Sequence, residues 1–239
     1  MRANELFRAG KLAEAIRELN EELRKVPTDT QRRTFLFELL CFAGDMDRAE
    51  KQLDILSQGG KNSELGAMLY RSALHAERER QTYFKDKAYL NHSAVLSDDR
   101  GGTLNGKPFK SISDSDERIG ARLEAFVAGS YMWIPFEHIA SLQIQAPKRL
   151  RDLLWTPVIV HTGPTFQNQE LGEVLAPVLA PFSSTHQDDQ VRLGRASVWE
   201  AGDDGEIPFG QKLLLVDGEE IPILEIRRLE FTQAAAAAH

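Results

Sequence analysis

The strongest restriction on the fold of this chain is a repeat with a spacing of 34 residues near the N-terminus. A shift of 34 positions places small and apolar residues of one segment on matching residues of the next. The pairs are Gly10 and Gly44, Leu6 and Leu40, Ala9 and Ala43, Ala15 and Ala49, Leu19 and Leu53, and Leu12 and Met46. A repeat of this length predicts helix–turn–helix units that stack on one another.

The period is that of the tetratricopeptide repeat. Gly10 and Gly44 fall where the first helix of each unit ends, because glycine adopts the left-handed conformation at little cost. Ala15 and Ala49 come early in the second helix, where a small side chain lets two helices approach closely. We predict helices at about 2–9, 12–26, 29–43, 46–58 and 63–85. A plain helical bundle is the alternative.

Two of these helices carry distinct apolar patterns. The segment Phe35–Phe42 is apolar almost all round, which predicts a central, buried helix. In the last helix one stripe contains Leu65, Met68, Leu69, Ser72, Ala73 and Ala76. The next shift of 34 from Gly44 reaches Arg78, so the repeat has decayed there. We therefore expect the last helix to cap the stack.

Beyond about residue 102 the periodicity changes to two, which predicts strands. Asn105-Gly106 and Asp217-Gly218 each lie between short runs, as in two-residue β-hairpins. Further strands are predicted at 123–127, 131–134, 155–161 and 196–199, and short helices at 136–142 and 147–154. The predicted fold class is α+β, with a tetratricopeptide-like helical repeat followed by a small, bent antiparallel β-rich domain. The predicted domains are 1–90 and 91–232, and 233–239 is read as a tail or vector remnant.

Charge and cysteine content exclude several classes of protein. Residues after 91 carry 13 basic and 21 acidic side chains, a net charge of −8. Such a surface repels nucleic acid and favours a partner with basic residues. The single cysteine, Cys41, cannot form an internal disulfide, and no apolar run has membrane-spanning length. We expect a cytoplasmic protein that binds neither nucleic acid nor membrane.

Known catalytic and metal-binding motifs are absent from the sequence. It contains no zinc spacing of His and Cys, no phosphate-binding glycine loop and no nucleophile elbow. The acidic residues Asp114, Asp116 and Glu117 are expected in a solvated loop or as a cap for the following segment. We therefore predict no catalytic residues, no cofactor and no metal. The competing hypothesis is a small-molecule enzyme or sensor that uses Glu137, His138, Arg149, Arg151 and Asp152 in the β-rich domain.

Several blocks resemble the ImpE family, also called TagJ or SciE-type, in order along nearly the whole chain. They are Leu36–Ala49, Trp133–Ile139, Arg149–Trp155, Val191–Arg195 with Trp199, Gly210–Leu214 and Glu225–Arg227. The resemblance implies a non-enzymatic, cytosolic accessory protein of bacterial type VI secretion. It also implies binding to the N-terminal helix of the small sheath subunit TssB, and indirectly a link to the ClpV ATPase that disassembles the sheath.

Two surfaces are candidates for holding such a helix. One is the concave face of the repeat, where we name Phe7 and Leu36. The other is the aromatic side of the predicted sheet, near Tyr131 and Trp133. A short repeat stack leaves one face unpaired, which favours the first.

Overall fold

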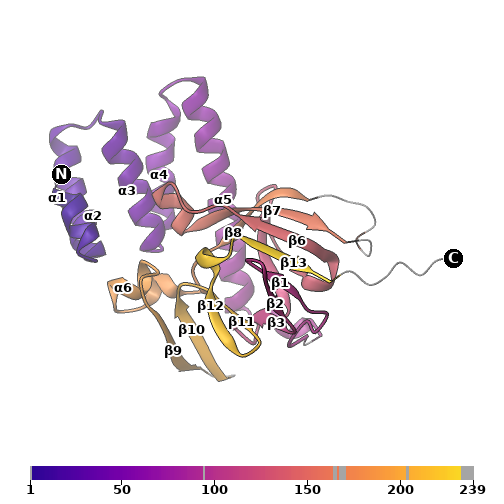
Figure 1. Ribbon diagram of the computed structural model, residues 1–239. Coiled ribbons are helices and arrows are strands. Elements are labelled where there is room, and N and C mark those ends of the chain that lie inside the picture. Colours follow the sequence, from indigo (N-terminus) through magenta and orange to yellow (C-terminus); the bar gives the residue numbers. More distant parts are fainter. Residues whose placement is uncertain (1, 94, 164–165, 167–170, 203–204, 233–239) are drawn as a thin grey trace. The chain divides into compact units, whose positions relative to one another are not determined.

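The computed structural model describes residues 2–93, 95–163, 166, 171–202 and 205–232. The chain divides into two compact units, each made of two chain segments. The first contains Met1–Gln81 and Leu179–Gln211, and the second contains Thr82–Val178 and Lys212–His239. Figure 1 labels the elements of both units. The mixture of an N-terminal helical region and antiparallel strands confirms the predicted α+β fold class.

Five helices account for the N-terminal region, close to the predicted ranges. They are α1 (Arg2–Arg8), α2 (Leu12–Lys25), α3 (Thr30–Phe42), α4 (Met46–Ser57) and α5 (Lys61–Lys85). Gly10 and Gly44 end the first helix of each pair with φ of 76° and 72°. Successive helices α1–α4 run antiparallel in Figure 1, as a helix–turn–helix repeat requires.

The repeat residues with small or apolar side chains form the core between these helices. Ala15 and Ala49 are both fully buried, which agrees with the close approach predicted from their size. Helix α3 is the central helix, and its residues Phe37, Leu39 and Leu40 have no exposed surface. Phe37 also packs edge-on against Tyr70 of α5, with ring centroids 4.9 Å apart.

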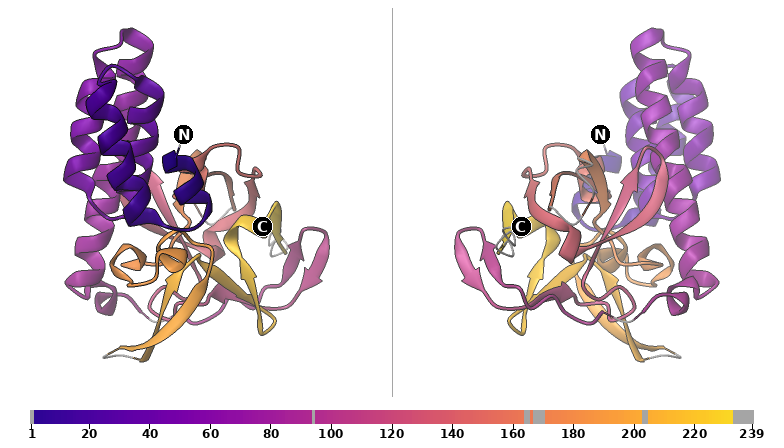
Figure 2. Two further views of the ribbon diagram at one scale, coloured as in Figure 1. Left: turned by 90° about the vertical axis from the view of Figure 1, so that its left-hand side faces the viewer. Right: turned by 90° about the vertical axis from the view of Figure 1, so that its right-hand side faces the viewer.

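A segment from the C-terminal half completes the first unit. It contains a short 3-10 helix (Ser183–Thr185), helix α6 (Asp189–Arg192) and strands β9 (Ser197–Gly202) and β10 (Gly205–Gly210). β9 and β10 pair antiparallel, and both views of Figure 2 show them as a two-stranded ribbon in light orange. The predicted strand at 196–199 is thereby confirmed.

This segment contacts the ends of the first helix in each repeat. Arg195 donates hydrogen bonds to the carbonyl oxygens of Phe7 and Arg8, at 2.8 and 3.0 Å. Arg192 donates to the carbonyl of Ala43, at 3.4 Å. The last carbonyls of a helix lack the usual partners within it, so these arginines supply donors at the ends of α1 and α3, where the Phe7 carbonyl also accepts from the Gly10 backbone at 2.9 Å. The approach is close, because a Cβ added at Gly10 meets the side chain of Gln190 at 1.7 Å.

The two units therefore do not follow the predicted division of the chain near residue 90. The sequence analysis assigned 91–232 to one β-rich domain, whereas Leu179–Gln211 is grouped with the helices. The physical reason is that arginines of this segment donate hydrogen bonds to α1 and α3. Contacts between residues so distant in the chain leave no local pattern in the sequence.

The second unit is built on an eight-stranded antiparallel sheet with the strand order β2-β1-β13-β6-β7-β8-β4-β5. Its strands are β1 (Gly102–Leu104), β2 (Lys107–Phe109), β4 (Arg122–Val127), β5 (Ser130–Pro135), β6 (Ile139–Ile144), β7 (Trp155–Thr162), β8 (Gly172–Pro177) and β13 (Arg228–Phe231). A second sheet has the order β12-β11-β3, with β3 (Ile112–Asp114), β11 (Leu213–Val216) and β12 (Glu219–Pro222). Their inward-facing side chains, including Ile134, Val158 and Leu229, form one apolar core.

Both predicted hairpins are present. Asn105-Gly106 joins β1 to β2, and Asp217-Gly218 joins β11 to β12. All four turn residues have positive φ, between 50° and 88°, as this type of two-residue turn requires.

Some local predictions in this unit are wrong. The expected helix at 136–142 is a single 3-10 turn, Phe136–His138, followed by β6. The expected helix at 147–154 is reduced to the 3-10 turn Leu150–Leu153. Further 3-10 turns span Ala88–Asn91 and Ile223–Glu225. Ile139, Leu142 and Ile144 point into the core, so pairing of β6 with β7 and β13 overrides the helix-like spacing.

Candidate functional site

The N-terminal half of α5 exposes a row of large apolar side chains. Leu65, Met68 and Leu69 are exposed to 62%, 62% and 72%. Their spacing of three and four residues places them on one face of the helix. Farther along, Ala73 and Ala76 are buried, so the stripe found in the sequence is only half covered. We call Leu65, Met68 and Leu69 the α5 stripe.

The residues named on the repeat are less accessible. Phe7 is half-buried, packs edge-on against Phe35 with centroids 5.6 Å apart, and carries the guanidinium of Arg195 at 4.8 Å from its ring. Leu36 is 2% exposed. Both side chains serve the packing of the repeat, and neither forms an open apolar surface.

The aromatic residues named on the sheet are held in a cluster within the second unit. Trp133 packs against Tyr83 at the end of α5, with ring centroids 5.1 Å apart, and lies under the guanidinium of Arg122 at 5.2 Å. Tyr131 donates a hydrogen bond of 2.7 Å to Glu124 and accepts one from the Trp133 indole. This side of β5 is therefore packed against the chain's own residues.

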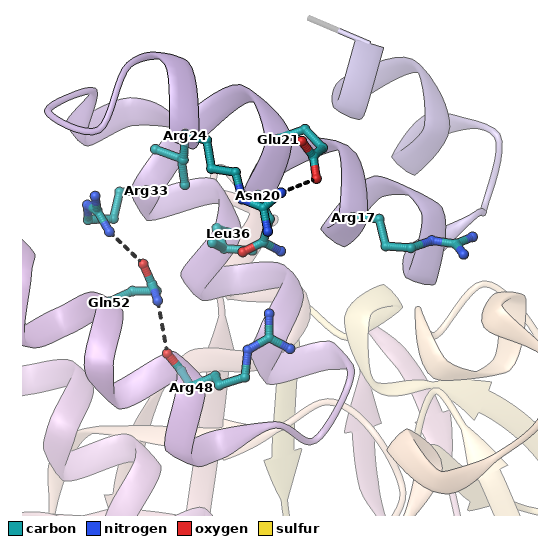
Figure 3. Close-up of a pocket in the computed structure, with 9 residues that line it drawn as sticks. Arg17, Asn20, Glu21, Arg24, Arg33, Leu36, Arg48 and Gln52 are labelled. Atoms are coloured by element: carbon teal, nitrogen blue, oxygen red, sulfur yellow. Dashed lines mark hydrogen bonds and ion pairs between the residues drawn. The ribbon is translucent and has the colours of Figure 1, made fainter.

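A charged groove of about 580 Å³ lies between α2, α3 and α4, and the sequence analysis did not identify it. Its lining residues are Arg17, Asn20, Glu21, Leu23, Arg24, Arg33, Leu36, Arg48 and Gln52. In Figure 3, Arg33 and Arg48 lie on either side of Gln52 and are both joined to it by hydrogen bonds. Arg17 and Arg24 are seven residues apart on one helix, the spacing by which the sequence could have indicated a shared face.

A buried charge network joins the two sheets of the second unit. The Lys212 ammonium lies 2.5 Å from Asp114 and also contacts Glu124. All three residues are 5% exposed or less. The prediction that Asp114 and Asp116 lie in a solvated loop is wrong, because Asp114 pairs with Lys212 and Asp116 pairs with Arg118 at 2.6 Å. Asp116 does cap the following turn, since it accepts from the Arg118 backbone.

The residues of the competing enzyme hypothesis are divided between a pocket and a turn. Glu137 lines a second pocket of about 410 Å³ with Arg100 and Arg122, and His138 is absent from that lining. Arg149 and Asp152 lie apart in the turn before β7, where Asp152 accepts from the Arg149 backbone.

The Cys41 thiol is buried, and the described part of the chain gathers no metal-binding group. Burial raises the pKa of the Cys41 thiol well above its ordinary value, so its nucleophilic thiolate is disfavoured. Across the described ranges, no three His, Cys, Asp or Glu residues come together as a metal-binding group. None of the helices described combines the length and apolar composition that crossing a bilayer demands.

The fold and surfaces define an α+β protein in which a helical region with two repeats carries an exposed apolar stripe. The ImpE protein family matches residues 106–230, and the chain belongs to this family. It is 29% identical to the type VI secretion system accessory component TagJ of Pseudomonas aeruginosa, over 97% of this chain and 91% of that protein. The crystal structure of protein VPA1032 from Vibrio parahaemolyticus has the same fold, with a TM-score of 0.86, 23% identity and full coverage of both chains.

Proposed function

We propose that this chain is a non-enzymatic, cytoplasmic adaptor of type VI secretion, and that it holds the N-terminal helix of the small sheath subunit TssB. Through the sheath it is linked indirectly to the ClpV ATPase. Membership of the ImpE family and the likeness to a type VI accessory component support the role in secretion. The structural observation that carries the adaptor proposal is the α5 stripe.

The stripe has the chemistry of a helix-binding surface. Exposing Leu65, Met68 and Leu69 to water is unfavourable, and covering each apolar side chain contributes roughly 1.5–3 kcal/mol. Next to them, Arg71 of α5 pairs with Asp54 of α4 at 2.7 Å. An apolar stripe beside polar groups suits the binding of an amphipathic helix. The apolar residues of that helix at i, i+3, i+4 and i+7 would contact the α5 stripe.

The α5 stripe replaces the two sites named from the sequence as the preferred docking surface. Leu36 and Phe7 are engaged in the repeat, and Trp133 and Tyr131 pack against Tyr83. The stripe belongs to the same helical unit as Phe7 and Leu36, so the preference for the repeat over the sheet is retained.

The test is binding of a fluorescein-labelled TssB N-terminal peptide to the full chain, measured by fluorescence anisotropy. We expect micromolar binding by the unchanged protein. The variant Leu65→Glu/Leu69→Glu should weaken it at least tenfold, since a carboxylate cannot enter an apolar contact without losing its hydration. Leu90→Glu is the matched control, because Leu90 is equally exposed, at 66%, and lies outside the stripe.

Three results would separate the alternatives. Equal affinity of the double variant and the unchanged protein would exclude the α5 stripe as the docking surface. Loss of binding in Trp133→Ala, with the stripe variant unaffected, would move the site to the sheet. Absence of binding at high micromolar peptide would contradict the adaptor proposal itself.

A further inference from the structure

The groove between α2, α3 and α4 is lined mainly by positively charged side chains, although the chain as a whole is acidic. The whole chain has a net charge of −7. The lining of the groove, however, contains the four arginines Arg17, Arg24, Arg33 and Arg48 and one acidic residue, Glu21. Charges of one sign lining a concave surface strengthen the local potential and attract ligands of the opposite sign. A positive groove on an acidic protein therefore selects for an acidic ligand.

The arginines at the two sides of the groove are held in place by uncharged partners or by helix caps. Arg33 donates to the Gln52 side chain at 2.8 Å and to the Pro27 carbonyl at 2.6 Å. Neither contact neutralises its charge. Arg48 pairs at 3.0 Å with Asp45, the residue that caps α4. Guanidinium groups fixed in this way lose little freedom when they bind carboxylates in a bidentate manner.

The two arginines of α2 are more exposed. Arg24 pairs with Glu21 at 2.7 Å, but its side chain remains 75% exposed. An ion pair so open to water contributes little stability and exchanges readily for another carboxylate. For Arg17, the described residues offer no hydrogen bond or ion pair that competes with a ligand.

The floor of the groove offers little apolar surface. Leu23 and Leu36 line it with 7% and 2% of their surfaces exposed. Asn20 and Gln52 add side-chain amides at its edges, and such amides pair with peptide backbone groups. The volume, about 580 Å³, suits a few side chains and is in the usual range for a ligand site.

We propose that this groove binds a short acidic segment of a second protein partner, whose carboxylates pair with the arginines of the lining. A nucleic acid is disfavoured by the chain's net charge of −7 and by Glu21 within the groove. The inference goes beyond the adaptor role argued above, because the lining comes from α2, α3 and α4 and does not include the α5 stripe. The two surfaces give one helical unit two separate docking sites.

The test uses the full chain and a short fluorescein-labelled peptide that contains four acidic residues. Affinity is measured by anisotropy at low and physiological salt. We expect saturable binding that Arg17→Glu/Arg24→Glu weakens by about tenfold, the effect of losing one good charge-assisted contact. The matched control is Lys25→Glu, which places the same kind of charge reversal on an exposed position of α2 outside the groove. Arg48→Gln gives a second variant that keeps a hydrogen-bonding side chain.

The competing outcomes are distinct. An equal loss with Lys25→Glu shows attraction by net charge alone and overturns the proposal. The proposal is also overturned if a single-stranded oligonucleotide of equal charge displaces the labelled peptide as effectively as unlabelled peptide does at the same concentration. A peptide with its acidic residues replaced by the corresponding amides should bind at least severalfold more weakly, and equal binding contradicts the role of the arginines. Because the TssB peptide and the stripe variants are separate reagents, failure here leaves the adaptor role intact.

Discussion

Asp189 accepts a hydrogen bond of 3.2 Å from the backbone nitrogen of Ala13, although 176 positions separate the two residues in the chain. Ala13 lies in the first turn of α2, and the Lys11 side chain before it makes no capping hydrogen bond. In the second repeat the position equivalent to Lys11 is Asp45, which caps α4 by accepting from the Arg48 backbone. The distant carboxylate thus supplies to the first repeat the cap that the second repeat carries in its own sequence.

Removing this cap should destabilise the helical unit. Asp189→Ala is expected to lower the free energy of unfolding by about 0.5–2 kcal/mol, the usual effect of losing a helix N-cap. Lys11→Asp in the same variant should restore most of that loss, since it places a local cap where Asp45 stands in the second repeat. Urea denaturation followed by circular dichroism measures both effects. A rescue that fails would contradict the equivalence of Lys11 and Asp45.

The isolated fragment 1–85 should be less stable than the helices are in the full chain. It lacks Asp189, and it also lacks the Arg192 and Arg195 contacts to the ends of α3 and α1. We expect a lower thermal midpoint and partial loss of helical signal in circular dichroism. Adding a synthetic 179–211 peptide should recover helicity. A fragment as stable as the full chain would show that the repeat folds without this segment.

The helical region was predictable because its signals are local. Gly10, Gly44, Ala15 and Ala49 are set by turn conformation and close packing, and the predicted helix bounds differ from the observed ones by two residues at most. The capping role of Asp189 was not predictable, because a cap supplied from a distant segment leaves no pattern near Lys11. The strand β6 was missed for the same kind of reason, since its conformation is decided by its neighbours β7 and β13.

For the candidate sites, the sequence identified apolar surfaces better than charged ones. The spacing of Leu65, Met68 and Leu69 predicts the α5 stripe. It does not predict that the stripe is exposed, because that depends on where the stack of helices ends. The groove brings Arg33 and Arg48 from different helices to the α2 arginines, so tertiary packing alone creates it.

Enlarging the small residues between helices should test the repeat packing. Ala15 and Ala49 have no exposed surface, and a tryptophan at either position overfills the contact between neighbouring helices. Ala15→Trp or Ala49→Trp is expected to lower the free energy of unfolding by roughly 1–3 kcal/mol. Thermal melting measures the change. Ala13→Trp, at an exposed position of α2, is the control and should have a much smaller effect.

Lys212 should be essential for the second unit, since it compensates two buried carboxylates. Lys212→Met leaves Asp114 and Glu124 without their shared cation, and breaking a buried ion pair in this way costs about 3–5 kcal/mol. Asp114→Asn/Glu124→Gln in the same background should recover part of the loss, because no buried charge then remains unpaired. Lys107→Met, at an exposed position, is the control for loss of a positive charge. An unchanged denaturation midpoint for Lys212→Met would contradict the burial of the network.

The same network predicts a pH dependence of stability through Asp114. Burial raises the pKa of this carboxyl from 3.8 to about 6, while Lys212 lowers it and the carboxylates of Asp116 and Glu124 raise it. Lys212 is shared with Glu124, so it offsets only part of the cost of burying the Asp114 carboxylate. Because the folded state keeps the Asp114 proton to higher pH than the unfolded state, this group stabilises the fold most below pH 4.

That contribution is lost as the pH rises through about 6, since the folded state must then hold the charged carboxylate. The difference in unfolding free energy between the unchanged protein and Asp114→Asn should therefore fall between pH 4 and pH 7, by up to about 2–3 kcal/mol. Carboxylates that do not interact with Asp114 titrate alike in both proteins and cancel in this difference. Urea denaturation at several pH values measures it, and Asp99→Asn, at an exposed loop position, is the control with an expected flat difference. A difference for Asp114→Asn that rises with pH over this range would mean that Lys212 dominates and holds the carboxyl ionised in the fold.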